Sequence, residues 1–281
     1  MGTETLRAGL VQLNAGPDIE PNLEAARPLV TRAARDEGAA LVCLPENAAF
    51  MAFGREMVMA RARTEEAHPA LAAMREWAAD LGIWLLAGTL AVKVPGEERV
   101  ANRSFLLDPD GGIAARYDKL HMFDVDLGGG ESYRESALYR PGDTAVVAET
   151  PWGGLGMTVC YDVRFPHLYR RLAEAGARLL TVPSAFTVPT GEAHWHVLLR
   201  ARAIETGCFV LAPAQCGTHH KGRRTYGHSL IVDPWGTVLA DGGETPGVVA
   251  ADLDLAMVDG MRERIPSLRH ARPLDAGESM A

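Results

Sequence analysis

The sequence predicts an α/β domain whose β-sheets are covered by helices. Three observations lead to this fold class: segments with strand patterns alternate with segments of helical periodicity, the connections are short, and no Pro/Ser-rich linker or block of charge divides the chain. We therefore expect one domain over residues 1–265, followed by a polar tail over 266–281.

The first elements follow from these patterns in chain order. Residues 6–13 read as an apolar strand, and a helical pattern over about 22–37 ends at Gly38. Pro28 lies inside that helix and should kink it. The apolar run 40–44 is typical of a buried strand.

The next elements are a helix and three strands. The helix is expected around 65–81, and strands are expected over 84–92 and 102–107. An Asp-Pro-Asp-Gly-Gly string at 108–112 is a strong turn signal, and it leads into a strand over 113–117.

The polar, glycine-rich stretch 118–142 is unusually long for a connection inside a compact domain. Such stretches are more often functional than idle, so we expect it to wall a site. Beyond it, the sequence predicts a strand over 178–182, a helix over about 192–206 capped by Gly207, and a strand over 208–213. The last strands should form a terminal meander, at 229–232, 238–240 and 248–250.

Cys160 lies where an apolar strand runs out and a helix follows. Pro166 opens the helical pattern, so the turn before it should hold Cys160 at a helix N-terminus. The positive end of a helix dipole would lower the pKa of the thiol and favour the thiolate. The competing interpretation is a small, buried apolar residue.

Glu46 and Lys119 also follow apolar strands. Burial at the mouth of the strand would raise the pKa of Glu46 towards that of a general base, although a solvated glutamate is the simpler alternative. Lys119 could equally be a surface ion-pair partner. Together with Cys160, they supply a nucleophile, a base and a cation for a developing oxyanion.

Composition excludes several function classes. The net charge of −8 argues against a nucleic-acid surface, and no apolar run approaches the length of a membrane span. The N-terminus lacks the pattern of a secretory signal, so we expect a cytoplasmic protein. The four cysteines fit neither a disulfide framework nor a zinc site, so we expect reduced thiols and no metal or organic cofactor.

Three local strings resemble the catalytic motifs of the nitrilase (carbon-nitrogen hydrolase) superfamily, in the same chain order. They are Leu-Pro-Glu at 44–46, Asp-Lys-Leu-His at 118–121 and Val-Cys-Tyr-Asp-Val-Arg-Phe-Pro at 159–166. The resemblance extends from residue 6 to the C-terminal tail. It implies a four-layer α-β-β-α sandwich with two mixed sheets flanked by helices, a homodimer, and a Glu-Lys-Cys triad of Glu46, Lys119 and Cys160.

Other strings resemble the Nit branch of omega-amidase-like enzymes. They lie at 191–195, 200–206 and 226–229, and the segment 214–220 is similar to the subgroup that hydrolyses deaminated glutathione. Glu135 matches the second glutamate that supports the triad in this family. Glu192 departs from the family string, which has proline there, and this affects helix entry rather than chemistry.

The resemblance implies a cysteine-dependent amidase that converts a small carboxamide into a carboxylic acid and ammonia through a thioester. Its substrate would be deaminated glutathione or a related omega-amide of a 2-oxo acid. The backbone N–H of Tyr161 would help to bind the oxyanion. Arg164 could pair with a substrate carboxylate or, as a structural alternative, with Asp162. Phe186 and Thr187 would line the opening of the same site around Cys160.

Competing functions remain at this point. An N-carbamoyl amide hydrolase or a nitrilase would use the same triad on another electrophile, and a binding protein would keep the fold without catalysis. A Cys-His hydrolase would need His121 or His167 as its base. A metal cluster is disfavoured because alternate histidines on a helix diverge. Its candidate ligands are His194, His196, His219 and His220.

Overall fold

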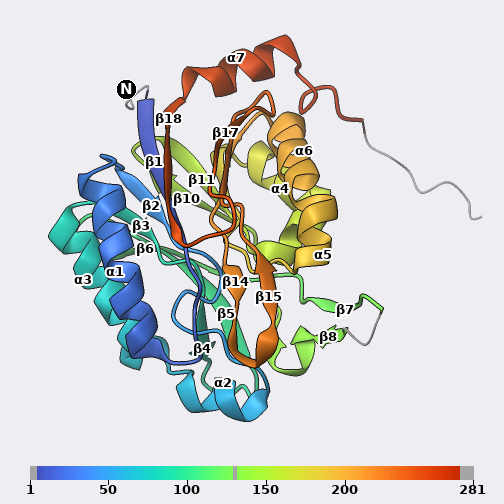
Figure 1. Cartoon of the computed structure of the whole chain (residues 1–281). Helices are drawn as coiled ribbons and strands as arrows, with labels where there is room; N and C mark the ends of the chain where they lie inside the picture. The colour runs from blue at the N-terminus through green and yellow to red at the C-terminus, as the bar shows by residue number, and fades with distance from the viewer. Residues whose placement is uncertain (1–4, 129–131, 273–281) are drawn as a thin grey trace, which may run out of the picture.

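The structure is a computed structural model that describes residues 5–128 and 132–272. Two central sheets lie between two layers of helices (Figure 1). Helices α1 and α3 cover the first sheet, and α4 and α6 cover the second. No helix in the described ranges is both long enough and apolar enough to cross a bilayer. The helices are α1 (Ile19–Arg35), α2 (Arg55–Arg61), α3 (Pro69–Leu81), α4 (Pro166–Glu174), α5 (Val188–Thr190), α6 (His196–Thr206) and α7 (Ala256–Arg264).

The first sheet has the strand order β18-β1-β2-β3-β5-β4, and β6 and β9 also pair with β5. It is mixed, because β1, β2 and β3 run parallel while β18 pairs antiparallel with β1. Its strands are β1 (Thr5–Gln12), β2 (Leu41–Cys43), β3 (Trp84–Leu86), β4 (Leu90–Lys93), β5 (Val100–Leu107), β6 (Ile113–Asp118), β9 (Tyr139–Arg140) and β18 (Gly247–Asp254).

The second sheet has the order β10-β11-β12-β13-β16-β17, with a parallel centre formed by β11, β12 and β13. Its strands are β10 (Val146–Thr150), β11 (Gly153–Met157), β12 (Ala177–Thr181), β13 (Phe209–Ala212), β16 (Leu230–Val232) and β17 (Val238–Asp241). Two short hairpins stand apart from both sheets, namely β7 (Asp124–Asp126) with β8 (Ser132–Arg134), and β14 (Cys216–Thr218) with β15 (Arg224–Tyr226).

Strand alternation explains the layers. Leu6 and Leu10 of β1 belong to the core cluster that also contains Met157 of the second sheet. Val11 lies on the opposite face of β1, in the cluster that contains Val30 of α1. Successive side chains of a strand point to opposite faces, so one strand serves both the space between the sheets and the helix layer. The expected α/β fold with mixed sheets and flanking helices is confirmed.

The first helix begins earlier than expected. It starts at Ile19 rather than near residue 22, because Pro21 lies in the first turn, where its missing N–H removes no helix hydrogen bond. The helix continues through Pro28 to Arg35.

Two predicted elements are each interrupted in the structure. The helix expected over 65–81 starts only at Pro69, and His68 before it is extended, as a residue preceding proline tends to be. The strand expected over 84–92 is broken into β3 and β4 at Gly88, which has φ +64°. A Cβ at Gly88 would lie 1.9 Å from the Pro45 carbonyl oxygen, so this turn requires glycine.

The terminal meander is only partly correct. Strands β16 and β17 pair antiparallel as expected, but β18 leaves them and pairs with β1 over eight residues, from Thr5–Asp254 to Gln12–Gly247. This pairing covers the outer edge of β1, which would otherwise expose its backbone groups. Sequence analysis also missed α2, α7, β10 and both short hairpins. The proposed limits of the domain and its tail stay a prediction, and residues 273–281 lie outside the described ranges.

Candidate active site

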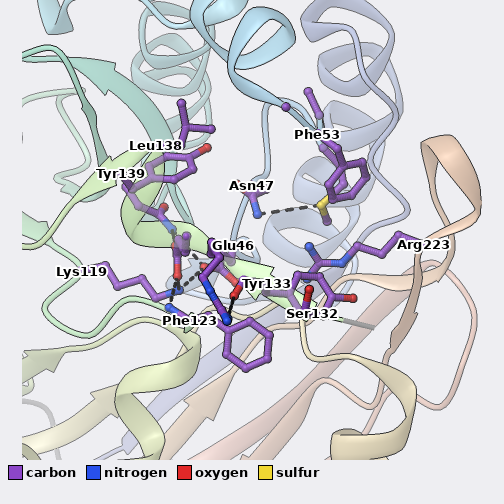
Figure 2. Close-up of a pocket in the computed structure, with 16 residues that line it drawn as sticks. Glu46, Asn47, Phe53, Lys119, Phe123, Ser132, Tyr133, Leu138, Tyr139 and Arg223 are labelled. Atoms are coloured by element: carbon purple, nitrogen blue, oxygen red, sulfur yellow. Dashed lines mark hydrogen bonds and ion pairs between the residues drawn. The ribbon is translucent and has the colours of Figure 1, made fainter. Parts of the chain in front are cut away.

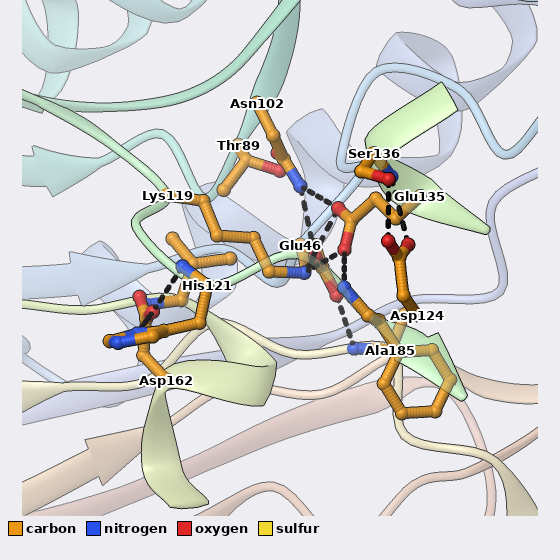
Figure 3. A network of polar contacts seen from close by, with 12 residues as sticks. Glu46, Thr89, Asn102, Lys119, His121, Asp124, Glu135, Ser136, Asp162 and Ala185 are labelled. Carbon is orange, nitrogen blue, oxygen red and sulfur yellow. Dashed lines mark hydrogen bonds and ion pairs between the residues drawn. The ribbon is translucent and has the colours of Figure 1, made fainter. Parts of the chain in front are cut away.

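Three loops that follow strands bring the predicted triad together. Glu46 follows β2, Lys119 follows β6 and Cys160 follows β11. The Lys119 ammonium lies 3.0 Å from Glu46 Oε1 and 2.9 Å from Glu135 Oε2 (Figure 3). Both Glu46 and Lys119 are buried, so neither is the solvated or surface residue of the simpler interpretations.

Ala185 joins the base to the nucleophile. Its backbone N–H donates to Glu46 Oε2 at 3.0 Å (Figure 3). Cys160 also lies beside the Ala185 backbone, and its thiol is close enough to the Glu46 carboxylate for each group to shift the pKa of the other. The carboxylate is therefore placed to accept the proton of the thiol.

Cys160 occupies a strained turn, with φ +48°. It begins the short 3₁₀ helix η3 (Cys160–Arg164), so the α-helix expected behind it starts only at Pro166. The buried carboxylate of Asp162 holds this turn. It accepts hydrogen bonds from the Val159 N–H at 2.9 Å and from the Tyr117 hydroxyl at 2.6 Å.

The expected lowering of the Cys160 pKa is wrong. Burial raises the pKa of the thiol, and the nearby Glu46 carboxylate raises it further, while Lys119 only partly opposes them. The resting nucleophile is thus a neutral thiol. One 3₁₀ turn supplies too little dipole to overcome the loss of solvation.

The expected raising of the Glu46 pKa is also wrong. Burial acts in that direction, but the charge and hydrogen bond of Lys119, together with the Cys160 hydrogen bond, outweigh it and leave the pKa below its usual value. Burial lowers the pKa of Lys119, yet Glu135 and Glu46 outweigh burial and hold it well above the usual value. The centre therefore rests as a carboxylate, an ammonium and a thiol.

Two polar groups that sequence analysis missed fix the carboxylates. The Asn102 side chain donates to Glu46 Oε1 at 3.0 Å and to Glu135 Oε1 at 3.2 Å. The Phe123 N–H donates to Glu135 Oε2 at 2.6 Å. An asparagine inside the apolar strand β5 was a signal, because a buried amide needs partners.

The main pocket lies beside the carboxylates and encloses about 260 Å³ (Figure 2). Much of its wall comes from the stretch 118–142, as expected for a functional segment. Its lining residues are Glu46, Asn47, Met51, Ala52, Phe53, Gly54, Asn102, Lys119, Phe123, Ser132, Tyr133, Arg134, Glu135, Leu138, Tyr139 and Arg223.

Cys160 lines a smaller recess, and Phe123 forms a wall common to this recess and the main pocket. The predicted contacts Tyr161, Phe186 and Thr187 also line the recess. These residues meet because the loops after β11 and β12 lie side by side.

Arg164 does not make the alternative ion pair with Asp162. Its guanidinium lies 5.9 Å from the ring centroid of Tyr161 and 5.5 Å from that of Phe186, and it contacts His194 Nδ1 at 3.3 Å. Asp162 instead accepts hydrogen bonds from the Tyr117 hydroxyl and the Val159 N–H, and so holds the turn. Arg164 thus lies over two residues of the recess.

The four histidines considered as a metal cluster do not gather. His219, for example, is bound to the Ala15 carbonyl and the Thr225 hydroxyl. Among the described residues, a different group could offer metal ligands: atoms of His196, His228 and Asp241 lie within 4.8 Å of one another. They form direct hydrogen bonds and ion pairs, and none of them lines the main pocket or the recess.

The remaining alternative base, His121, is engaged elsewhere. Its Nδ1 lies 2.7 Å from Asp162, and its ring stacks on Phe165 with a centroid separation of 3.5 Å. Neither His121 nor His167 lines the Cys160 recess. The geometry therefore favours Glu46 as the base.

The chain is similar to known proteins. Residues 7–263 match the model of the carbon-nitrogen hydrolase family. A deaminated glutathione amidase of Synechocystis sp. is 43% identical over 266 residues, covering 94% of this chain and 97% of that protein.

Solved structures are similar as well. The C. elegans NitFhit protein superposes with a TM-score of 0.88 at 38% identity, covering 97% of this chain and 66% of that longer chain. An amidase from Nesterenkonia sp. AN1, solved with acrylamide added at its active-site cysteine, gives 0.77 at 29% identity, covering 93% of this chain and 98% of that one.

Proposed function

This chain belongs to the carbon-nitrogen hydrolase family and hydrolyses carbon–nitrogen bonds in linear amides, and we propose that Cys160, Glu46 and Lys119 are its catalytic residues. The observation that carries this proposal is the position of Glu46, which lies beside the Cys160 thiol and 3.0 Å from the Lys119 ammonium. A nucleophile, a base and a cation that lie next to one another, at a pocket and a recess with a common wall, are what acyl transfer requires.

In the first half of the reaction, Glu46 accepts the Cys160 proton as sulfur attacks the amide carbon. Negative charge then moves from the carboxylate to the sulfur and on to the amide oxygen, and Lys119 lies close enough to stabilise it throughout. The backbone N–H of Tyr161 is the second oxyanion donor. The C–N bond breaks as Glu46 returns the proton to the leaving nitrogen.

In the second half, water hydrolyses the thioester. Glu46, again a carboxylate, takes a proton from the water as it attacks, and the thiol is restored when the acid departs. Glu135 does not exchange protons in this scheme. It holds Lys119, whose ammonium it binds through both carboxylate oxygens, at 3.0 and 2.9 Å.

For the substrate, we propose deaminated glutathione or a related omega-amide of a 2-oxo acid. The support is the name of the relatives that are about 40% identical over most of the chain. The leaving group is ammonia for a primary carboxamide. It is the amine of the peptide remainder for deaminated glutathione, because the amide bonds of that molecule are secondary.

Acyl-side recognition falls to Arg164, Phe186 and Thr187 in this proposal. A guanidinium over aromatic rings next to the Cys160 recess is suited to a carboxylate on the acyl part. A panel of deaminated glutathione, alpha-ketoglutaramate, N-carbamoyl-beta-alanine and a simple nitrile tests this. Preferred turnover of the carbamoyl compound or the nitrile would contradict the substrate proposal.

Replacement of Cys160 tests the catalytic proposal. Cys160→Ala should abolish hydrolysis of every amide in the panel while leaving the thermal unfolding midpoint close to that of the wild type. Cys208→Ala is the matched control, because Cys208 is another free, buried thiol that lines neither the main pocket nor the recess. Retained turnover by Cys160→Ala would end the proposal.

We also propose a homodimer. Val197 and Ile204 of α6 and Trp235 after β16 are large apolar side chains that are 67, 43 and 52% exposed. Gly236 packs on Ile204, which makes this surface continuous between α6 and the β16–β17 turn. A second copy would bury it. Light scattering of the wild type and of Val197→Glu should give a dimer and a monomer, respectively.

The proposed location is the cytoplasm. The described cysteines Cys43, Cys160, Cys208 and Cys216 are all free and buried, which suits a reducing compartment. Fractionation of cells that produce the protein, followed by immunodetection, tests this location.

A further inference from the structure

Arg223 is a cation in the wall of the main pocket that no carboxylate of the described ranges neutralises. Its Nη2 donates to the Ala185 carbonyl at 3.0 Å, but its Nε is buried and has no hydrogen-bond partner. None of the ion pairs among the described residues includes it. A cation in a pocket wall that is not neutralised by a carboxylate is able to bind an anionic ligand.

Two aromatic rings hold this guanidinium. It lies 5.3 Å from the ring centroid of Phe53 and 5.0 Å from that of Tyr133 (Figure 2). A stacked guanidinium is already ordered before a ligand arrives, and its planar fork matches a carboxylate through two parallel hydrogen bonds.

The hairpin that carries Arg223 is anchored to the core. Asn14 donates to the Cys216 carbonyl at 2.5 Å, and His219 Nδ1 lies 2.9 Å from the Ala15 carbonyl oxygen, so two contacts tie the hairpin to the segment after β1. The position of Arg223 is therefore set by the fold rather than by a free loop.

Arg223 also borders an outer recess, which we call the basic vestibule. Phe53, Tyr133 and Arg223 line both the vestibule and the main pocket, so the two spaces adjoin. Three cations and no acid are among its described lining residues, which are Phe53, Tyr133, Val188, Pro189, Lys221, Gly222, Arg223 and Arg224.

One residue, Ala185, connects the vestibule to the reacting groups. Ala185 donates its N–H to Glu46 and accepts from Arg223 through its carbonyl. In hydrolysis through a thioester, the acyl part stays on Cys160 while the amine part leaves. The amine part must therefore face a space through which it can depart.

We propose that Arg223, assisted by Lys221 and Arg224, binds a carboxylate on the amine part of the substrate. This inference rests on the proposed amidase function and narrows its substrate class. The preferred substrates are N-substituted amides whose leaving amine ends in an anionic group, as the C-terminus of a peptide does. Arg164 serves the acyl part, so each side of the scissile bond has its own guanidinium.

Two substrates with the same acyl part test this. They are deaminated glutathione and its derivative with a C-terminal carboxamide in place of the carboxylate. Arg223→Gln should lower kcat/KM for the carboxylate substrate at least about tenfold, chiefly through KM, because a charge-assisted hydrogen bond is lost. The carboxamide derivative should lose much less, so that the ratio of the two kcat/KM values falls at least about fivefold, while any loss common to both substrates reports the contact of Arg223 with Ala185 and its charge near Glu46.

Two further variants sharpen the result. Arg223→Lys keeps the charge but not the fork, so it should retain part of the preference for the carboxylate. Arg35→Gln removes an exposed cation from the last turn of α1 and should leave both substrates unaffected. If Arg223→Gln lowers kcat/KM equally for both substrates, Arg223 only positions Ala185 and Glu46, and the inference is overturned.

A binding measurement separates this inference from the proposed function. In Cys160→Ala protein, calorimetry should show tighter binding of the carboxylate compound than of the carboxamide derivative, and adding Arg223→Gln should remove the difference. Equal affinities would overturn the inference, whatever the turnover. An intact difference in a wild type that hydrolyses neither compound would overturn the proposed function alone.

Discussion

Lys119 and Arg223 are two cations of the same pocket with opposite surroundings. Lys119 is 2% exposed and lies against two carboxylates, at 3.0 and 2.9 Å. Arg223 is partly exposed, rests on two aromatic rings and has no ion-pair partner among the described residues. Both cations face the same space, yet the fold neutralises only one of them.

The difference separates a cation suited to catalysis, Lys119, from a cation suited to substrate binding, Arg223. A buried charge must be paired, and the pairing fixes the geometry that a developing oxyanion needs. A cation left without a carboxylate keeps its binding capacity for a ligand. We therefore expect substitutions around Lys119 to change kcat for every amide, and substitutions at Arg223 to change selectivity.

The largest effect should come from Lys119→Met. It leaves Glu46 and Glu135 buried without their cation, so activity should fall below detection for all substrates. The free energy of unfolding should fall by about 3–5 kcal/mol, the usual cost of breaking a buried pair. Urea denaturation and the amide panel measure both. A stable, active variant would mean that Lys119 is needed neither for catalysis nor for the fold.

Glu46→Gln comes next and tests the assignment of the base. Glutamine keeps the shape but cannot accept the Cys160 proton, so kcat should fall by about 10²–10⁴-fold for every substrate. If the rate hardly changed, a histidine would have to act as the base, in the Cys-His scheme considered above. The single-turnover rate of thioester formation is the direct measurement.

Glu135→Gln should have a smaller effect. Lys119 keeps its contact with Glu46, but loses the carboxylate that holds it from the other side. Slight misplacement of the ammonium should lower kcat by about 100-fold while KM changes little. A change in KM alone would instead place Glu135 in substrate binding.

The smallest expected effect concerns the stability of the protein at acidic pH. The pKa of Glu46 in the folded protein is below its usual value, which is about 4.3 in an unfolded chain. The ionised carboxylate therefore stabilises the fold above about pH 4.3, and this stabilisation is lost as the pH falls through the lower pKa of the folded state. Glu46→Gln should remove this part of the acid dependence. Thermal midpoints of the wild type and the variant between pH 3 and 6, roughly the span around that value, test it. Parallel curves would contradict the direction of the shift.

The catalytic residues were more predictable from sequence than the basic vestibule around Arg223. Glu46, Lys119 and Cys160 each follow a recognisable apolar strand, and their local strings resemble known motifs. Arg223 lies in a short hairpin with no such pattern. Its importance depends on Phe53 and Tyr133, which are distant in sequence and meet it only in the folded chain.

The sequence by itself determined the α/β class, most of the strands and the identity of the reacting groups, because periodicity and local motifs are properties of neighbouring residues. Only the tertiary structure decided the pairing of β18 with β1 and the protonation states of the centre. The sequence suggested a lowered pKa for Cys160 and a raised one for Glu46. The reverse holds, because burial and the position of Lys119 depend on segments that are far apart in the chain.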